Sequence, residues 1–359
     1  MQQSIRYLKT RDNVRLAWAT SGDGPPLVKA ANWLSHLSYD LESPIWRHWV
    51  EFFSAHYRFI RYDERGCGMT DWDVENVSPS LWVDDLEAVV EASEPGGPFV
   101  LLGISQGTAA AVTYAARHPD RVSHLILYGG YPLGWAHRED SEGYKRFRAI
   151  VELARQGWGK SNPIFRQVFT ALFVPEARPE QLEWFNELCR RTTTPEMAAK
   201  LFAARAEVDV REYLPQISVP TLVIHARQDE VVPFSSGKML ATEIPGAEFV
   251  QLDSRNHILL ADEPAWTRFK DVVLGFTGRP SAQGAEDPMF AVLSARERDI
   301  LAALVAGQSN VDIGAALFIS EKTVRNSLTR IFEKLGVRTR TQAAVLARDR
   351  GFNPAQARD

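Results

Sequence analysis

The stretch LLGISQGTAAA (Leu101–Ala111) decides the fold, because it joins a strand-like apolar run to an alanine-rich, helix-like run through a serine. Ser105 stands between Gly103 and Gly107. A turn of this kind holds the serine in strained backbone geometry, and small neighbours let the strand and the helix approach closely. The serine side chain then projects at the carboxyl-terminal edge of a sheet, beside the positive end of a helix. The stretch predicts that Ser105 is a nucleophile at a tight turn between a strand and a helix.

A serine nucleophile needs a base, and the base needs an orienting carboxylate. The segment TLVIHARQDEVVP places Asp229 in the loop after an apolar run, and VQLDSRNHILLADEP places His257 just after the next run. Catalytic triads built at the carboxyl ends of parallel strands can follow this order along the chain: nucleophile, acid, histidine. We therefore predict that Ser105, Asp229 and His257 are the catalytic residues. A plain turn serine at Ser105 remains the alternative.

Strand-like and helix-like runs alternate from the start of the chain to about Thr277. Helical spacing of apolar residues marks 79–92 and 106–117. This alternation predicts an α/β fold, a mostly parallel sheet with helices on both faces. The predicted strands are Val14–Thr20, Leu27–Ala31, Tyr57–Tyr62, Phe99–Ile104, Val122–Tyr128, Thr221–Ala226 and Phe249–Leu252.

Residues 134–215 interrupt that alternation, because they contain no convincing strand and many aromatic residues. We interpret them as a helical cap over one end of the sheet. For any single aromatic residue, a place in the core of the cap is favoured over contact with a ligand. The aromatic residues are Trp135, Trp158, Phe165, Phe169, Phe173, Trp184 and Phe202.

Composition restricts the class of protein. The 359 residues suit one large and one small domain, and 45% hydrophobic with 24% charged residues is typical of a globular protein. No apolar run is long enough to span a membrane, and the first residues do not resemble a signal peptide. Cys67 and Cys189 are far apart, which indicates a reduced, cytoplasmic protein. Without a cluster of metal ligands or a phosphate-binding loop, we expect no metal and no cofactor.

Residues 1–277 resemble a capped α/β hydrolase. Besides the three residues above, YDERGCGMTD (Tyr62–Asp71) resembles the D-x-R-G-x-G-x-S loop of that family, and DEVVP (Asp229–Pro233) resembles its acid loop. The resemblance implies that the backbone N–H groups of Trp33 and Gln106 form an oxyanion hole. Leu34 and Trp135 are further candidate ligand contacts. Several family residues differ here: Ala31-Asn32 replaces His-Gly, Ala226 replaces a glycine of the acid loop, and Asn256 replaces the glycine before the histidine.

The charge of the chain is unevenly distributed. The whole chain has a net charge of −4, but residues 289–359 carry 11 Lys+Arg and 7 Asp+Glu, a net of +4. The preceding segment, TGRPSAQGAEDP (Thr277–Pro288), is rich in Gly, Pro, Ser and Ala and predicts a linker over 278–288. A basic domain on an acidic body places any nucleic-acid contact at residues 289–359.

Residues 289–359 predict four short helices. Ser294 with Glu297, and Ser309 with Asp312, form capping patterns, and Ser320 caps the third helix. Gly307 ends the first helix, and the fourth extends from about Thr341 to Gly351. The pair 309–317 and 320–335, joined by a short turn, is a helix-turn-helix.

The second helix of that pair has two distinct faces. Val324, Leu328, Ile331 and Leu335 form a buried stripe, which leaves Lys322, Arg325, Asn326 and Thr329 on the opposite face. Basic and amide side chains on an exposed face suit phosphates and base edges of DNA. An ordinary solvated charged face is the alternative.

This segment is similar to the LuxR-type (GerE-like) DNA-binding domain through L-S-x-R-E, G-x-S-N, I-S-x-K-T-V-R and K-L-G-V, which occur in order. The resemblance implies that 320–335 is the recognition helix and that a homodimer binds a double-stranded operator. Val311 and Ser327 stand where the family often has Lys and His. The expected DNA contacts are Lys322, Thr323, Arg325, Asn326, Thr329 and Arg330.

Three functions are compatible with these features. The first is a ligand-responsive transcriptional regulator whose hydrolase-like domain senses a small ester, lactone or aromatic molecule under its cap. The second is an active serine hydrolase, an esterase, lactonase or C–C hydrolase, with an appended DNA-binding domain. The third, favoured least because the triad is complete, is a scaffold whose pocket no longer functions.

Overall fold

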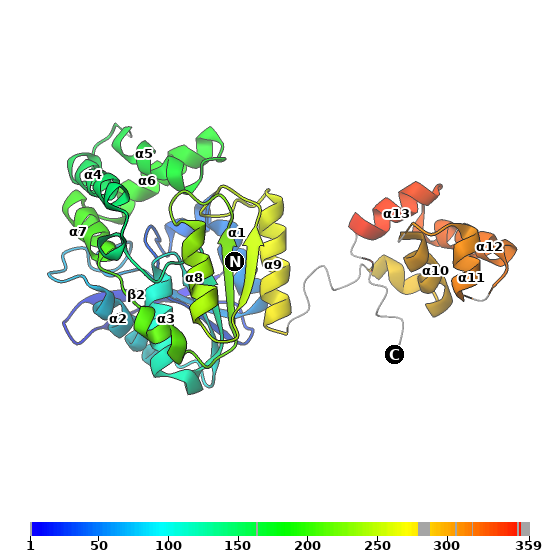
Figure 1. The fold of residues 1–359 in the computed structure, drawn as a ribbon, viewed down its shortest axis with the longest axis horizontal. Coiled ribbons are helices and arrows are strands. Elements are labelled where there is room, and N and C mark those ends of the chain that lie inside the picture. The colour runs from blue at the N-terminus through cyan, green and yellow to red at the C-terminus, as the bar shows by residue number, and fades with distance from the viewer. Residues whose placement is uncertain are drawn as a thin grey trace. The chain divides into compact units, whose positions relative to one another are not determined.

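The computed structural model describes residues 2–162, 164–278, 288–305, 307–317, 319–349 and 352. The chain divides into two compact units, Met1–Val273 and Leu274–Asp359 (Figure 1). Most of the predicted linker, residues 279–287, and the predicted end of the last helix at Gly351 lie outside the described residues.

The larger unit contains an eight-stranded sheet in the order β1-β2-β4-β3-β5-β6-β7-β8. Strands β1 and β2, and β2 and β4, pair antiparallel, and every other neighbouring pair is parallel. This sheet confirms the predicted α/β class. The strands are β1 (Gln3–Lys9), β2 (Arg15–Ser21), β3 (Pro26–Lys29), β4 (Arg58–Tyr62), β5 (Phe99–Ile104), β6 (Val122–Tyr128), β7 (Thr221–Ala226) and β8 (Glu248–Leu252).

The sequence prediction missed β1. The central strands β5 and β7 are buried along their whole length, so they read as continuous apolar runs. In contrast, β1 lies at the edge of the sheet with no fully buried residue, and its QSIRYLK sequence has no apolar run. An edge strand of this kind is specified by its pairing with β2, in the register Ile5↔Ala19, more than by hydrophobic pattern.

Helices cover both faces of the sheet (Figure 1). On one face α1 (Arg47–His56) packs against α9 (Pro264–Phe276), where the rings of Trp49 and Phe269 are 4.8 Å apart. On the other face lie α2 (Pro79–Ser93), α3 (Gly107–Arg117) and α8 (Phe234–Glu243). Short 3-10 turns at Tyr39–Glu42 and Pro119–Arg121 complete the connections. These layers leave only the two ends of the sheet open for a site.

The helical cap follows β6, as the sequence predicts. The 3-10 turns Trp135–His137 and Arg211–Gln216 begin and end it, and an isolated bridge between Leu133 and Asp209 brings its two ends together. Asp140 and Thr194 cap α4 and α7 through their side chains. The cap helices are α4 (Ser141–Gly157), α5 (Ile164–Phe173), α6 (Pro179–Thr192) and α7 (Pro195–Ala206), which lie together beyond one end of the sheet (Figure 1).

The described residues of the smaller unit form helices and short turns, and they include the predicted helix-turn-helix. A 3-10 turn, Pro288–Val292, precedes the helices. All three predicted capping contacts are confirmed: Ser294 Oγ accepts from the N–H of Glu297, Ser309 Oγ from Asp312, and Ser320 Oγ from Thr323. The helices are α10 (Ala295–Val305), α11 (Asn310–Leu317), α12 (Glu321–Leu335) and α13 (Arg340–Asp349).

The predicted apolar stripe of α12 is the core of this unit. Val324 and Ile331 are fully buried, and Leu328 and Leu335 are 6% and 5% exposed. They pack with residues of the other three helices, among them Ile300, Ile313 and Ala343. Burial of this one face leaves the other face of α12 to solvent.

Candidate functional site

The turn at Ser105 has the strained geometry that the sequence predicts. Ser105 has φ +52°, and its N–H donates to the carbonyl of Tyr128 at 2.9 Å. A Cβ at Gly103 would lie 2.9 Å from Thr108 Cα, and one at Gly107 would lie 2.9 Å from the carbonyl oxygen of Ala31. Only glycine therefore lets β5, α3 and the loop after β3 pack this closely.

Asp229 and His257 form the acid–histidine pair at the ends of β7 and β8. His257 Nδ1 donates to Asp229 Oδ2 at 2.6 Å, and both side chains are 1% exposed. Asp229 Oδ1 accepts from the N–H groups of Val231 and Val232 at 2.8 and 2.9 Å, so the DEVVP loop holds the carboxylate in place. This contact orients the imidazole and leaves Nε2 unbound, the arrangement that a general base requires.

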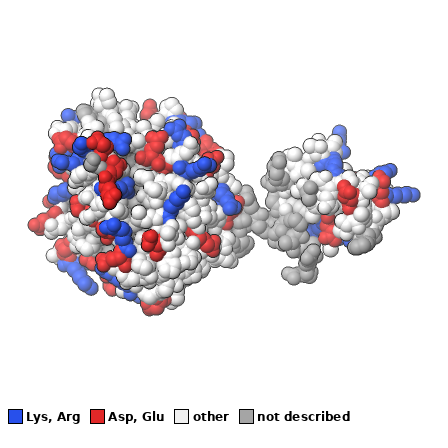
Figure 2. All heavy atoms as spheres, in the orientation of Figure 1, with Lys and Arg blue, Asp and Glu red and all other residues white. Residues whose placement is uncertain are grey.

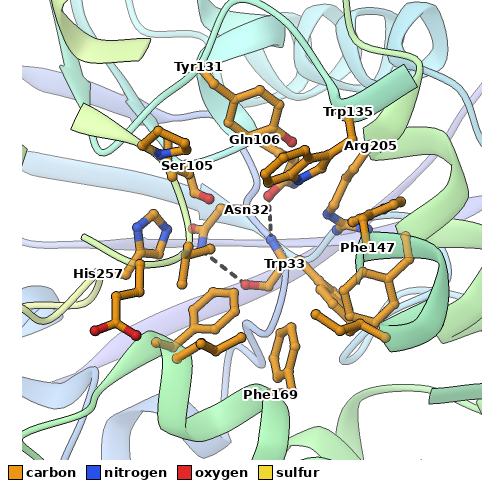
Figure 3. Close-up of a pocket in the computed structure, with 18 of the residues that line it drawn as sticks. Asn32, Trp33, Ser105, Gln106, Tyr131, Trp135, Phe147, Phe169, Arg205 and His257 are labelled. Atoms are coloured by element: carbon orange, nitrogen blue, oxygen red, sulfur yellow. Dashed lines mark hydrogen bonds between the residues drawn. The ribbon is translucent and has the colours of Figure 1, made fainter. Parts of the chain in front are cut away.

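Ser105 and His257 face the same cavity without a hydrogen bond between them (Figure 3). His257 Nε2 is buried and has no hydrogen-bond partner among the described residues. The backbone N–H of His257 donates to the carbonyl of Phe173 at 2.8 Å, and the Phe173 ring packs edge-on against the imidazole at 5.2 Å. Such catalytic contacts often tighten only when a ligand is bound.

The expected oxyanion hole is occupied by a side chain of the protein itself. The N–H of Trp33 donates to Oε1 of Gln106 at 2.9 Å (Figure 3). Nε2 of Gln106 donates to the carbonyl of Ala31 at 3.3 Å. Only this orientation of the Gln106 amide satisfies both contacts. One of the two expected donors is therefore already engaged, which weakens the site for stabilising an oxyanion.

Replacing Gln106 by methionine is expected to raise the rate of p-nitrophenyl acetate hydrolysis by about tenfold or more. Methionine has similar volume but no amide acceptor, so the Trp33 N–H becomes available to an oxyanion. The measurement is kcat/KM by absorbance, with Gln156→Met on exposed α4 as the matched control. An unchanged or lower rate would mean that Gln106 supports the loop instead of blocking the hole.

A cavity of about 470 Å³ lies between the cap and the carboxyl ends of the strands. This volume suits a small organic ligand. Trp33 lines it, stacked on Trp158 at 5.1 Å and edge-on to Phe202 at 4.2 Å. The aromatic rings that line the cavity are Trp33, Trp46, Tyr131, Trp135, Phe147, Phe169, Phe173 and Phe202.

Four of the predicted cap aromatics contribute to that wall. Trp135, Phe169, Phe173 and Phe202 line the cavity, whereas Trp158 packs behind Trp33. Trp184 stacks on Tyr39 at 4.5 Å, and the side chain of Phe165 lies outside the described residues. Leu34 does not line the cavity; it is 1% exposed and has φ +62°.

Polar groups that sequence reasoning missed also face the cavity. Asn32 donates from Nδ2 to the carbonyl of Trp33 at 3.1 Å, and its Oδ1 is buried without a partner among the described residues. Arg205 and Arg138 come from the cap and lie against aromatic rings, 4.5 Å from Trp33 and 4.2 Å from Trp135. No local sequence pattern indicates that these arginines face the cavity, because their position depends on how the cap packs over the sheet.

The Tyr62–Asp71 loop beneath the cavity is structural. Arg65 donates from Nε and Nη2 to both oxygens of Asp85 at 2.7 and 2.6 Å, and both side chains are 1% exposed. This bidentate pair anchors the loop to α2. The anchored loop positions Glu64 against the cap, where its carboxylate accepts from Arg205.

The predicted DNA contacts all lie on the exposed side of α12. Arg325 donates to Glu321 at 2.7 Å, an exposed pair that costs little to break. Basic and acidic side chains stand together on the visible faces of both units (Figure 2). The exposed residues are Lys322, Thr323, Arg325, Asn326, Thr329 and Arg330.

Two absences hold for the part of the chain that the structure describes. No helix there is long and apolar enough to cross a membrane. No three of its His, Cys, Asp and Glu side chains gather into a group that could hold a metal. Cys67 and Cys189 are both free and buried.

The sheet order, the capped cavity and the residues after β5, β7 and β8 define an α/β hydrolase domain, and the smaller unit is a LuxR-type helix-turn-helix domain. The chain belongs to the α/β-hydrolase family described as serine aminopeptidase, S33, whose model matches residues 48–264. A second model, bacterial regulatory proteins of the luxR family, matches residues 291–347. This protein therefore joins a hydrolase domain to a DNA-binding domain.

Similar proteins cover the hydrolase domain. The chain is 28% identical over 263 residues to the AB hydrolase superfamily protein YisY of Bacillus subtilis, covering 70% of this chain and 91% of YisY. It is 27% identical to 3-oxoadipate enol-lactonase 2 of Acinetobacter baylyi, covering 71% and 91%. The crystal structure of a hydrolase from Pseudomonas aeruginosa has a TM-score of 0.63 at 24% identity, covering 77% and 98%, and supports the fold.

Proposed function

We propose that this protein is a ligand-responsive transcriptional regulator whose hydrolase domain binds a small organic molecule under its cap. The single observation that carries the proposal is the joining of a helix-turn-helix domain to a capped aromatic cavity in one chain. A ligand controls DNA binding only if it favours one arrangement of the protein over another. DNA binding also requires the protein to act where the genome is, so we propose a cytoplasmic location.

The site supports ligand binding over rapid turnover. The Trp33 N–H donates to Gln106, and His257 Nε2 has no hydrogen bond to Ser105. A ligand can gain a hydrogen bond with the unpartnered Nε2 of His257 together with contacts to the aromatic wall. Ser105, Trp33, Gln106, Trp135 and His257 are the proposed contacts, whereas Leu34 would act only by holding the loop backbone.

A serine hydrolase is the second candidate, and it is favoured by two specific observations. The 2.6 Å contact between His257 and Asp229 and the φ of +52° at Ser105 are the features of a working triad. Under this reading His257 deprotonates Ser105 and Asp229 orients the imidazole. Slow turnover that removes the ligand would be compatible with regulation.

The DNA-binding unit is proposed to act as a homodimer on two half-sites of a double-stranded operator, with α12 in the major groove. The six residues of α12 predicted to contact DNA would bind phosphates and base edges.

Selection of bound duplexes from random DNA by the purified full chain tests the regulator proposal. Enrichment of one motif with two related half-sites is the expected result, and its affinity should change when an aromatic ester, lactone or acid is added. If no motif is enriched at moderate salt, with or without these compounds, the regulator proposal fails.

A further inference from the structure

Arg205 is the buried cation of the cavity wall. It lies in the last turn of α7 and is 8% exposed. Its Nη2 donates to Oε2 of Glu64 at 2.7 Å, and the Glu64 side chain is 1% exposed. The pair connects the cap to the anchored Tyr62–Asp71 loop, so the position of the guanidinium is defined from both sides.

Aromatic rings hold the guanidinium in one orientation. Its carbon lies 4.5 Å from the ring centre of Trp33 and 5.7 Å from that of Trp82. A guanidinium over an aromatic face gains cation–π energy and keeps its N–H groups directed to the side. Arg205 lies across the cavity from Ser105 and His257 (Figure 3). A ligand that fills the cavity therefore has one end near Ser105 and the other near Arg205.

One end of this guanidinium has no acceptor. Nη1 of Arg205 is buried without a hydrogen-bond partner among the described residues, although the ion pair with Glu64 uses Nη2. A buried, charged N–H group without an acceptor is energetically costly. An anion that accepts a hydrogen bond from Nη1 would therefore stabilise the buried guanidinium of Arg205.

The carboxylates of the cavity wall are engaged elsewhere. Asp140 accepts from the N–H of Gly143 at 2.8 Å, and Glu230 pairs with Arg255 at 3.1 Å. A second wall cation, Arg138, donates from Nε to the carbonyl of Leu133 at 2.9 Å. Nη1 of Arg205 is thus a donor that the described part of the wall leaves to a ligand.

We propose that the ligand is an aromatic carboxylic acid, whose carboxylate binds Nη1 of Arg205 and whose ring lies among Trp33, Phe147 and Phe202. A carboxylate supplies the anionic acceptor that the guanidinium lacks, and the rings supply the stacking surface. The far end of the ligand faces Ser105 and His257. This inference rests on the proposed function and names the chemical class of the ligand at that same site.

Binding of the acid should weaken as pH rises from about 6 to about 8. Burial raises the pKa of Glu64 to about 7. Below that pH Glu64 is neutral and the charge of Arg205 is available to the ligand, whereas above it ionised Glu64 competes for Arg205. The ligand itself stays charged over this range, since carboxylic acids have a pKa of about 4. The other groups that interact with Glu64 are Lys29 of β3, Tyr62 of β4, Arg65 and Cys67 of its own loop, Asp85 of α2 and Tyr131 after β6.

The pH dependence is measured by titrating the full chain with 2-naphthylacetate and following tryptophan fluorescence. The neutral probe 2-naphthylacetamide should show no change over the same range, and Glu64→Gln should remove the pH dependence of the acid. A pH dependence that survives in Glu64→Gln would assign the effect to another group.

Arg205→Met tests the carboxylate contact directly. Wild-type protein should bind 2-naphthylacetate about tenfold more tightly than 2-naphthylacetamide, because a hydrogen bond to a charged group contributes about 1.5–3 kcal/mol. The variant should bind both probes equally. Since Arg205→Met leaves Glu64 buried and unpaired, the double variant Arg205→Met/Glu64→Gln keeps the pocket neutral and is measured alongside it. Arg148→Met, on the exposed side of α4, is the matched control.

Several outcomes would overturn the inference. Equal affinity of wild-type protein for the two probes, no binding of either probe, or a preference for the acid that survives in the double variant would each do so. The proposed regulator function fails separately, if the acid binds through Arg205 but leaves the affinity for the selected operator unchanged. If neutral aromatic compounds alone bind and change operator affinity, the function stands and the inference fails.

Discussion

Ser105→Ala is expected to lower ester hydrolysis by about 10³-fold or more and to retain ligand-dependent DNA binding. The loss follows because the serine is the only group at the turn after β5 that His257 would activate. Ligand binding should persist, since the aromatic wall and Arg205 are untouched. The two measurements are p-nitrophenyl acetate turnover and operator affinity with and without 2-naphthylacetate.

Ser105→Ala should be introduced both into the wild-type protein and into Gln106→Met. Because Gln106→Met is expected to hydrolyse esters faster, a loss of hydrolysis is easier to detect there. Ser236→Ala, at a buried serine of α8 outside the cavity wall, is the matched control. If Ser105→Ala abolishes the ligand response while the ligand still binds, covalent chemistry is part of sensing and the regulator proposal must include it.

The double variant Lys322→Ala/Arg325→Ala is expected to weaken operator binding by about 100-fold or more at fixed salt. Both residues are exposed on α12, so the lost groups are the proposed contacts to phosphates and base edges. The fold should survive, because the Arg325 side chain pairs with Glu321, an exposed contact within the same helix. Affinity is measured by fluorescence anisotropy with the selected duplex.

The single variants separate the two kinds of contact. Lys322→Ala should reduce the slope of log affinity against log salt by about one unit, the effect of one lost phosphate contact. Arg325→Ala should instead relax the preference for the selected sequence. Arg148→Ala removes one positive charge from the hydrolase domain and should change neither property. Equal loss of DNA binding and of ligand binding in the double variant would indicate misfolding.

The strands that hold the candidate site were predictable because their side chains are buried on both faces. The predicted and observed limits agree for β5, β6 and β7, each a run of Val, Leu or Ile between turn residues. The order of Ser105, Asp229 and His257 along the chain also indicated that they meet at one edge of the sheet. In contrast, β1 and the limits of the cap helices depend on pairing and packing that no short window of sequence contains.

The helix-turn-helix unit was the most predictable part. Its signals are local: a serine three residues before an acidic residue, an apolar residue at every third or fourth position, and glycines where φ is positive. Gly307 and Gly336 have φ of +81° and +67°. Each of these signals depends on neighbours within a few residues, so the sequence alone is sufficient to predict the helices and their ends.

The sequence by itself determined the class of the two domains, the positions of Ser105, Asp229 and His257, and the exposed face of α12, because periodicity and motif order specify them. The tertiary structure alone decided the state of the site. Gln106 reaches the N–H of Trp33 from 73 residues away in the chain, and Arg205 reaches Glu64 from 141 residues away. Both contacts depend on how the cap and loops close over the sheet, and that closure turns a predicted oxyanion hole into an occupied one and gives the cavity its cation.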